Sequence, residues 1–166
     1  PPVVFPDPVK FENFKKALTS LPFADYFKNT FFIVVVCVTG ILISTSLSGY
    51  GLSRVNWKYR DTVFYILMSS IMLPYFATLI PNFIMWTKFG LTNTFVPLTL
   101  PSWFGMGTSS IFGGGMFNIF LLRQFFRTIP RELDEAAFVD GAGHMQIFLR
   151  IILPLSKPAL ICVGLF

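Results

Sequence analysis

The chain has 166 residues, of which 54% are hydrophobic and only 13% charged, and its mean hydropathy is +0.66. Soluble domains carry about 25% charged residues, so this composition excludes an ordinary soluble protein. The net charge of +5 does not indicate a nucleic-acid partner, because the positive residues are not gathered in one segment as a phosphate-binding surface requires.

Long uncharged stretches identify an integral membrane protein. They lie between the following charged residues: Lys28 and Arg54, Asp61 and Lys88, and Lys88 and Arg123. A helix needs about 20 apolar residues to cross a bilayer. We therefore predict an all-α, polytopic transmembrane helical bundle with spans at about residues 30–52, 62–86 and 103–122, and another span starting near residue 156. The chain has no initiator Met and ends in an apolar run, so we expect an internal fragment of a longer protein.

The first part of the chain, residues 1–27, mixes polar residues, aromatics and prolines. It predicts an extended start followed by a short amphipathic helix with Phe11, Phe14 and Leu18 on one side. We expect this segment to be extracytoplasmic and residues 28–166 to form the transmembrane domain. In the first span, Gly40, Ser44 and Ser48 recur every four residues, which lets another helix approach closely in lipid.

The second predicted span contains Pro74 and Pro81, and proline inside a helix removes a hydrogen bond and introduces a kink. Such breaks persist in membranes where protein or water satisfies the freed carbonyl, so we expect this helix to face other helices or a pathway. The start of the next uncharged stretch reads as loop and interface because of four residues: Asn93, Pro97, Pro101 and Trp103.

Loop charge gives the orientation. The 54–60 loop and the 123–157 segment together carry eight basic residues: Arg54, Lys58, Arg60, Arg123, Arg127, Arg131, Arg150 and Lys157. The loop between the second and third spans carries only Lys88. The positive-inside rule therefore places the two basic segments in the cytoplasm.

A short acidic segment within the second basic region predicts a cytoplasmic helix at about residues 130–140. Pro130 suits a first helical turn, and Glu132, Asp134 and Glu135 lie where the helix dipole favours negative charge. Capping and solvation alone explain Glu132 and Asp134. Gly141 can end the helix in the left-handed conformation.

One face of this helix is thin enough for a narrow groove; its residues are Leu133, Ala136, Ala137 and Asp140. A second helical stretch follows and ends at Pro154, and its predicted apolar face consists of Met145, Phe148, Leu149 and Ile152. The pattern predicts a helix, a glycine elbow and a second helix, which together would pass a displacement to the membrane helix that follows.

The stretch "EAAFVDGAGHMQIFLRIILP" resembles the cytoplasmic signature of ABC importer permeases: Glu-Ala-Ala, three residues, Gly, nine residues, Ile-x-Leu-Pro. The positions in register are Glu135, Ala136, Ala137, Gly141, Ile151, Leu153 and Pro154. The stretches "NTFFIVVV", "GYGLSRVNW", "LIPNFIMWTKFGLTNT" and "FNIFLLRQFFRTIPRELDEAAFVDGAG" resemble the carbohydrate branch, with its maltose/maltodextrin and glycerol-phosphate type permeases.

This resemblance implies a multi-pass permease subunit of the bacterial inner membrane that moves a sugar by alternating access. The implied partners are ATP-binding ABC subunits, a second and different permease subunit, an extracytoplasmic solute-binding protein and membrane lipid. The chain would lack the first and last membrane helices of such a permease. Residues 123–154 would form the coupling segment that docks on the ATPase.

The same resemblance implies roles for individual residues. Glu135 would be the polar contact to the ATPase, Ala136 and Ala137 the close-packing face, and Gly141 the elbow. Leu133 and Asp140 would complete the docking face. The residues that support the coupling segment would be Ile151, Leu153 and Pro154.

Two alternatives remain at this point: an importer for a non-sugar solute such as a polyamine or a phosphate ester, and an intramembrane enzyme or channel. The predicted spans carry no Asp, Glu, Lys, Arg or His, which argues against an enzyme, and no catalytic residue is expected. The sequence has no G-x-x-x-x-G-K-[ST] motif, so this chain should bind no cofactor, and ATP and Mg²⁺ would belong to the partner ATPase.

Other polar and sulfur-containing residues give weaker indications. No metal site is expected, because His144 has no nearby ligand at suitable spacing, and Cys37 and Cys162 read as small buried hydrophobic residues. Side chains within or near the spans could contact a sugar, although helix packing explains them equally well; they are Tyr65, Asn82, Trp86 and Asn118.

Overall fold

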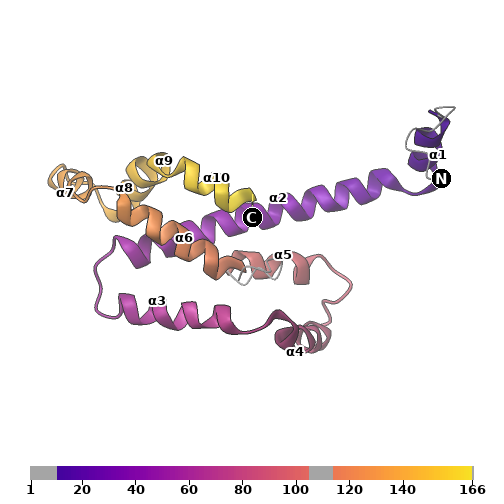
Figure 1. Cartoon of the computed structure of the whole chain (residues 1–166), viewed down its shortest axis with the longest axis horizontal. Coiled ribbons are helices and arrows are strands. Elements are labelled where there is room, and N and C mark those ends of the chain that lie inside the picture. Colours follow the sequence, from indigo (N-terminus) through magenta and orange to yellow (C-terminus); the bar gives the residue numbers. More distant parts are fainter. Residues whose placement is uncertain (1–10, 105–113, 166) are drawn as a thin grey trace, which may run out of the picture.

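The computed structural model describes residues 11–104 and 114–165, apart from the side chain of Tyr75. These residues form helices and no strand, in agreement with the predicted all-α fold class (Figure 1). The elements are α1 (Glu12–Ser20), α2 (Phe23–Ser53), α3 (Arg60–Ser69), η1 (Ser70–Met72), α4 (Tyr75–Lys88), α5 (Val96–Trp103), α6 (Gly114–Thr128), α7 (Glu132–Val139), α8 (His144–Ile147), η2 (Phe148–Ile152), α9 (Leu153–Leu155) and α10 (Lys157–Leu165).

Helix α2 contains the first predicted span and is longer than expected, because it begins at Phe23. The start of α2 extends away from the other helices of the bundle toward α1 (Figure 1). The predicted amphipathic helix is confirmed as α1, and every residue of α1 is exposed. Among the described residues, α2 alone is long and apolar enough to cross a membrane as one straight helix.

The second predicted span is not one kinked helix. The segments Arg60–Met72 and Phe76–Lys88 are bent by 98°, and α4 lies across the end of α3 (Figure 1). The break occurs where Leu73 and Pro74 adopt extended backbone conformations. Pro74 has no N–H to continue the helix, whereas Pro81 is accommodated inside α4.

The stretch expected to be loop and interface contains helix α5, so the expectation of a loop is wrong for Val96–Trp103. Pro97 lies at the start of α5, where a missing N–H costs nothing. Helix α5 packs against α2: the Sγ of Cys37 donates to the carbonyl of Leu98 over 3.3 Å, and the Oγ of Ser44 lies 3.4 Å from the carbonyl oxygen of Ser102.

A Cβ atom at Gly40 would lie 2.6 Å from Cδ1 of Trp103. This confirms that the small residues of the first span admit a close neighbour, and the neighbour is α5. The third predicted span falls partly on residues 105–113, which lie outside the described residues. Its described part, α6, continues past the predicted end to Thr128.

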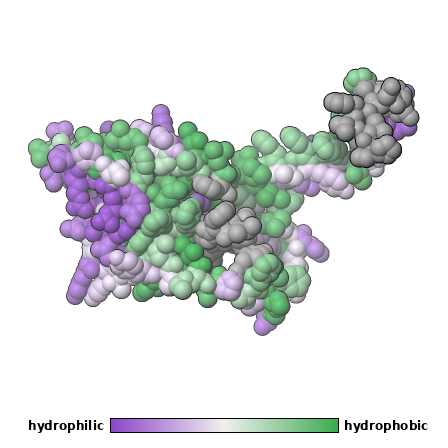
Figure 2. All heavy atoms as spheres, viewed as in Figure 1, coloured by the Kyte–Doolittle hydropathy of each residue, from purple (hydrophilic) through white to green (hydrophobic). Residues whose placement is uncertain are grey.

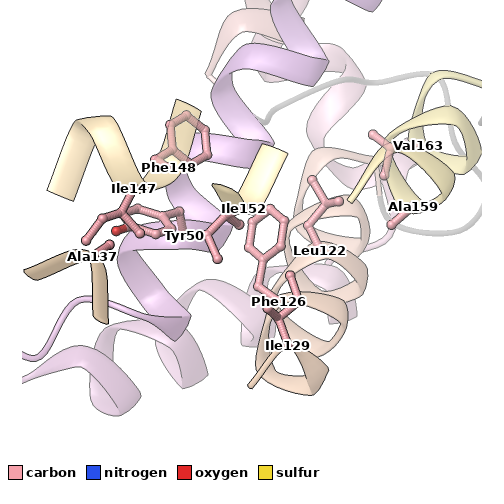
Figure 3. Packing of buried hydrophobic residues seen from close by; sticks show 10 residues of the cluster. All are labelled: Tyr50, Leu122, Phe126, Ile129, Ala137, Ile147, Phe148, Ile152, Ala159 and Val163. Atoms are coloured by element: carbon pink, nitrogen blue, oxygen red, sulfur yellow. The ribbon is translucent and has the colours of Figure 1, made fainter. Parts of the chain in front are cut away.

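The buried core lies at the end of the bundle that loop charge predicts to be cytoplasmic. This end is called the inner end below. The inner end comprises residues 49–54 at the end of α2, residues 122–129 at the end of α6, and the segment from α7 to α9. Figure 2 shows hydrophilic residues gathered at this end and hydrophobic residues along the middle. The main cluster draws on α2, α6, α7, α8, η2 and α10 (Figure 3). It contains Tyr50, Leu122, Phe126, Ile129, Ala137, Ile147, Phe148, Ile152, Ala159 and Val163. A packed core here holds α7 and the chain that follows it against the membrane helices.

Helices α2 and α6 approach each other closely at this end. A Cβ atom at Gly49 would lie 3.2 Å from Cβ of Leu122 and 3.5 Å from the backbone nitrogen of Arg123. A Cβ atom here would be in tighter contact than most side chains make, so Gly49 favours the close approach of α6 to α2.

Candidate functional site

The predicted cytoplasmic helix is present as α7, Glu132–Val139, with Asp140 as its C-cap residue. Three acidic residues occupy its first turn: Glu132, Asp134 and Glu135. An isolated helix of this length is marginal in water, so its contacts with the rest of the chain decide whether it forms.

The two faces of α7 have different environments. Leu133, Glu135, Ala136 and Asp140 are exposed, and Leu133 is 40% exposed. Ala137 was predicted to share this outer face but is buried in the main cluster instead. A surface of mixed charge and small apolar residues is therefore free on the outer side of α7.

Asp134 was attributed to capping and solvation, and that interpretation is wrong. Its side chain is 12% exposed, and Oδ2 lies 3.1 Å from Nε of Arg54, whose side chain is 2% exposed. The sequence offered little sign of this pair, because Arg54 and Asp134 lie far apart in the chain and each has a sufficient local explanation.

The glycine elbow after α7 is confirmed. Gly141 has a φ of +82°, in the left-handed region that glycine adopts without steric cost. The N–H of Gly141 donates to the carbonyl of Phe138, and the N–H of Ala142 donates to that of Ala137. These are the two hydrogen bonds of a Schellman motif, so α7 ends abruptly at a defined angle.

The second arm runs from α8 through the π-helical segment η2 to α9. Ile147, Phe148 and Ile152 are buried, whereas Met145 and Leu149, predicted to share that face, are exposed. The π turn shifts the register, because the N–H of Leu153 donates to the carbonyl of Phe148, five residues earlier rather than four.

The residues predicted to support the coupling segment lie at the end of this arm. Ile151 and Leu153 are partly buried and pack against the main cluster, whereas Pro154 is exposed. Pro154 has no N–H of its own to donate, which fits the position of the π turn directly before it. The chain then bends by 76° between His144–Leu155 and Lys157–Leu165.

Tyr50 of α2 joins the second arm to the bundle. Its hydroxyl donates to the carbonyl of His144 over 3.1 Å, and its ring lies 5.0 Å from that of Phe148, centroid to centroid (Figure 3). The His144 side chain is exposed and packs edge-on against Phe138 at 4.9 Å. The elbow is therefore supported on both sides.

A second ion pair, between Arg123 and Asp61, also lies at the inner end. Nη2 of Arg123 lies 2.6 Å from Oδ1 of Asp61, and its guanidinium carbon lies 3.8 Å from the centroid of the Phe64 ring. Desolvation works to raise the pKa of Asp61, but hydrogen bonds and charge from Arg60 and Arg123 outweigh it, so this pKa lies below its ordinary value.

The four predicted pathway residues lie on three different helices. Tyr65 on α3 is 71% exposed. Asn82 and Trp86 are partly buried, one turn apart on α4, and Asn118 is buried on α6. A pocket of about 340 Å³ opens instead between α2, α3, α5 and α6, and its lining includes Ser44, Ser48 and Trp103. Sequence spacing had pointed to the two serines only as packing residues.

Within residues 11–104 and 114–165, no group of three or more His, Cys, Asp or Glu could hold a metal ion. Cys37 is partly buried, and Cys162, predicted to be buried, is exposed on α10.

Comparisons with known proteins show the family of this chain. The family model described as binding-protein-dependent transport system inner membrane component matches residues 38–165. The chain is similar to the diacetylchitobiose uptake system permease protein NgcG of Streptomyces coelicolor, with 29% identity over 172 residues that cover 99% of this chain and 52% of that protein. It is also similar to the melibiose/raffinose/stachyose import permease protein MelC of Bacillus subtilis, with 33% identity over 96% of this chain and 56% of that protein.

One solved structure is similar over most of the chain. It is a chain of a bacterial ABC transporter involved in the import of the acidic polysaccharide alginate, with 30% identity and a TM-score of 0.70 over 83% of this chain and 45% of that one. The present chain thus spans about half the length of the relatives it matches.

Proposed function

We propose that this chain, which belongs to the family of binding-protein-dependent transport system inner membrane components, is the permease subunit of an ATP-driven importer for a sugar or sugar-like solute. Relatives named as permeases for diacetylchitobiose and for melibiose, raffinose and stachyose support this solute class. The protein would be multi-pass and would work by alternating access, with a second permease subunit, an extracytoplasmic solute-binding protein and a separate ATPase.

The observation that carries the proposal is the placement of α7. This helix lies at the extreme hydrophilic end of the molecule (Figures 1 and 2), is held by its buried face, and leaves Leu133, Glu135, Ala136 and Asp140 exposed. A thin helix with a carboxylate on its free face fits a groove that carries a positively charged residue, because charge-assisted hydrogen bonds are among the stronger polar contacts. In this arrangement the ATPase would bind ATP and Mg²⁺, and this chain would bind neither.

The pocket between α2, α3, α5 and α6 supports a neutral solute. Its lining residues are Ser44, Leu47, Ser48, Leu67, Trp103, Phe104, Met116 and Ile119. Hydroxyl groups beside an indole ring suit a polyhydroxylated molecule with an apolar ring face. A polyamine would need acidic groups and a phosphate ester would need basic groups, and the described lining residues include neither.

Replacement of Glu135 by lysine tests the docking role. The full-length protein, assembled with its partners, is assayed for uptake of labelled oligosaccharide and for ATP hydrolysis stimulated by the binding protein. We expect Glu135→Lys to lower both uptake and stimulated ATP hydrolysis by about tenfold or more. A tenfold decrease corresponds to about 1.4 kcal/mol of lost interaction. Glu132→Lys is the matched control, because Glu132 is an exposed acid in the same turn outside the signature.

Equal uptake and equal ATPase stimulation in Glu135→Lys and the wild type would contradict the docking role. The solute class has a separate test. An excess of unlabelled maltodextrin or chitobiose should compete with uptake, whereas spermidine and glycerol phosphate should not. If only spermidine or only glycerol phosphate competes with uptake, the transported solute belongs to that class and not to the sugars.

A further inference from the structure

Two arginines, one after α2 and one in α6, each donate hydrogen bonds to backbone carbonyls at the inner end of the other helix. Arg54, the C-cap residue of α2, donates from Nη1 to the carbonyl of Ile129 over 2.9 Å and from Nη2 to that of Pro130 over 3.1 Å. Arg123 of α6 donates from Nε to the carbonyl of Leu52 over 3.0 Å. Carbonyls at helix ends have no partner within the helix, so the two guanidinium groups join both ends into one unit.

Arg54 also holds α7. Besides the 3.1 Å approach of its Nε to Oδ2 of Asp134, its Nη2 lies 3.5 Å from Oδ1 of the same carboxylate. The buried guanidinium of Arg54 therefore contacts both the chain that follows α6 and the first turn of α7. The backbone of Arg54 caps the end of α2. Separation of this pair would leave a buried charge without its counter-ion, which is strongly unfavourable.

Few other groups attach α7 to the bundle. Of the residues of α7, only Asp134 and Ala137 are buried. Beyond the elbow, the next polar tie is the hydroxyl of Tyr50 on the carbonyl of His144. Both polar ties lead to the last turn of α2, which is distant from α7 in sequence.

We propose that Arg54 is a positioning residue for energy coupling, through which a displacement of α7 is carried directly to α2 and α6. This inference rests on the proposed function. The sequence pattern predicted a route through the elbow and Pro154 to α10. That route passes the π-helical segment and a 76° bend, whereas the route through Arg54 is a single buried side chain. α7, the inner half of α2 and α6 thus move as one body.

Distances between spin labels test the single body directly. The full-length protein, with Cys37→Ser and Cys162→Ser, carries labels at Val139 of α7 and at Lys58 beyond α2, both exposed. Double electron–electron resonance is recorded on the reconstituted transporter without nucleotide and with bound ATP. We expect one narrow distance distribution, unchanged between the two states, and a broadened distribution when Asp134→Asn is added. A Val139–Lys58 distance that shifts with ATP in the wild type overturns the inference.

Transport stoichiometry tests the role of the arginine. We expect Asp134→Asn and Arg54→Lys to keep the transporter assembled and hydrolysing ATP, while solute moved per ATP falls several-fold. Lysine keeps the charge but cannot reproduce the forked donors of arginine. Glu132→Gln is the matched control and should transport as the wild type does. Wild-type stoichiometry in both Asp134→Asn and Arg54→Lys overturns the inference.

The two failures are distinguishable. If the proposed function is wrong, the wild-type complex shows no ATP-dependent uptake and Glu135→Lys changes nothing. If only the role of Arg54 is wrong, wild-type uptake and the Glu135 effect remain, and the spin-label distance moves. Should Arg54→Lys fail to accumulate, the wild-type distance alone decides.

Discussion

Gly40 of α2 lies against the indole ring of Trp103, so close that a Cβ atom at Gly40 would be 2.6 Å from Cδ1 of the ring. This relationship positions α5 on α2 and forms one wall of the pocket that includes Ser44 and Ser48. Because side chains do not approach to such a distance, any residue larger than glycine must displace Trp103.

We therefore expect Gly40→Ala to lower the stability of the protein by about 1–3 kcal/mol, the usual cost of overpacking. Gly51→Ala is the control in the same helix, since a Cβ there meets nothing within 4 Å. Gly51→Ala should be neutral or stabilising, because alanine is the better helix former. Thermal unfolding in detergent measures both, and equal unfolding temperatures for the two variants would contradict the close packing.

The buried ion pair predicts a stability effect apart from transport. Asp134→Asn leaves Arg54 with two carbonyl partners but no counter-ion, so we expect a loss on the order of 2–4 kcal/mol. Glu132→Gln, in the same turn but exposed, should change the free energy of unfolding by less than about 0.5 kcal/mol. The same detergent unfolding assay compares them. A similar small effect for both would mean that the Arg54–Asp134 pair is not formed.

The elbow depends on backbone conformation. We expect Gly141→Ala to cost about 1–2 kcal/mol, because its φ of +82° is unfavourable for a residue with a Cβ. Gly143 has a φ of −81° and a ψ of 164°, which any residue adopts, so Gly143→Ala should be neutral or slightly stabilising. Hydrogen exchange of residues 136–142 measures the local effect. Faster exchange in Gly143→Ala than in Gly141→Ala would contradict the assignment of Gly141 as the elbow residue that requires glycine.

Asp61 predicts a pH dependence. Its pKa is lower in the folded protein than the ordinary value, so its contribution to stability is present above the ordinary aspartate pKa, about 4. The contribution is lost as the pH falls through the lower, folded pKa. The effect is small, because the Asp61 side chain is 56% exposed to solvent.

Wild-type protein should therefore be more stable than Asp61→Asn at pH 7, and the difference should shrink as the pH falls below about 4. Unfolding temperatures between pH 3 and pH 7 give this comparison. A difference that grows toward low pH would have the wrong sign for a carboxylate held by Arg60 and Arg123.

Features set by a residue itself or by its neighbours in the sequence could be predicted from the sequence. Gly141 ends α7 because its own φ decides the turn, and Gly40 admits α5 because small size alone allows close approach. The outer face of α7 followed from helical spacing, except for Ala137, since spacing does not tell which edge of a narrow stripe meets the bundle.

Features that depend on tertiary packing could not be predicted. Arg54 and Arg123 counted only as positive charges that indicate topology, and nothing local joins Arg54 to Asp134. Two prolines in the second span predicted a kink, but the bend is 98° because the backbone is extended at both Leu73 and Pro74. The π turn of η2 shifts the helical register after Phe148, and Met145 and Leu149 lie on the surface.

The central claim is that α7 faces the cytoplasm and docks there on an ATPase. Val139 is 88% exposed at the end of α7, so a cysteine at this position, with Cys37→Ser and Cys162→Ser, reports which side of the membrane α7 occupies. A maleimide that cannot cross membranes should label Val139→Cys in inside-out vesicles and not in intact cells, and added ATPase subunit should slow the labelling. Rapid labelling in intact cells would place α7 outside and contradict the account.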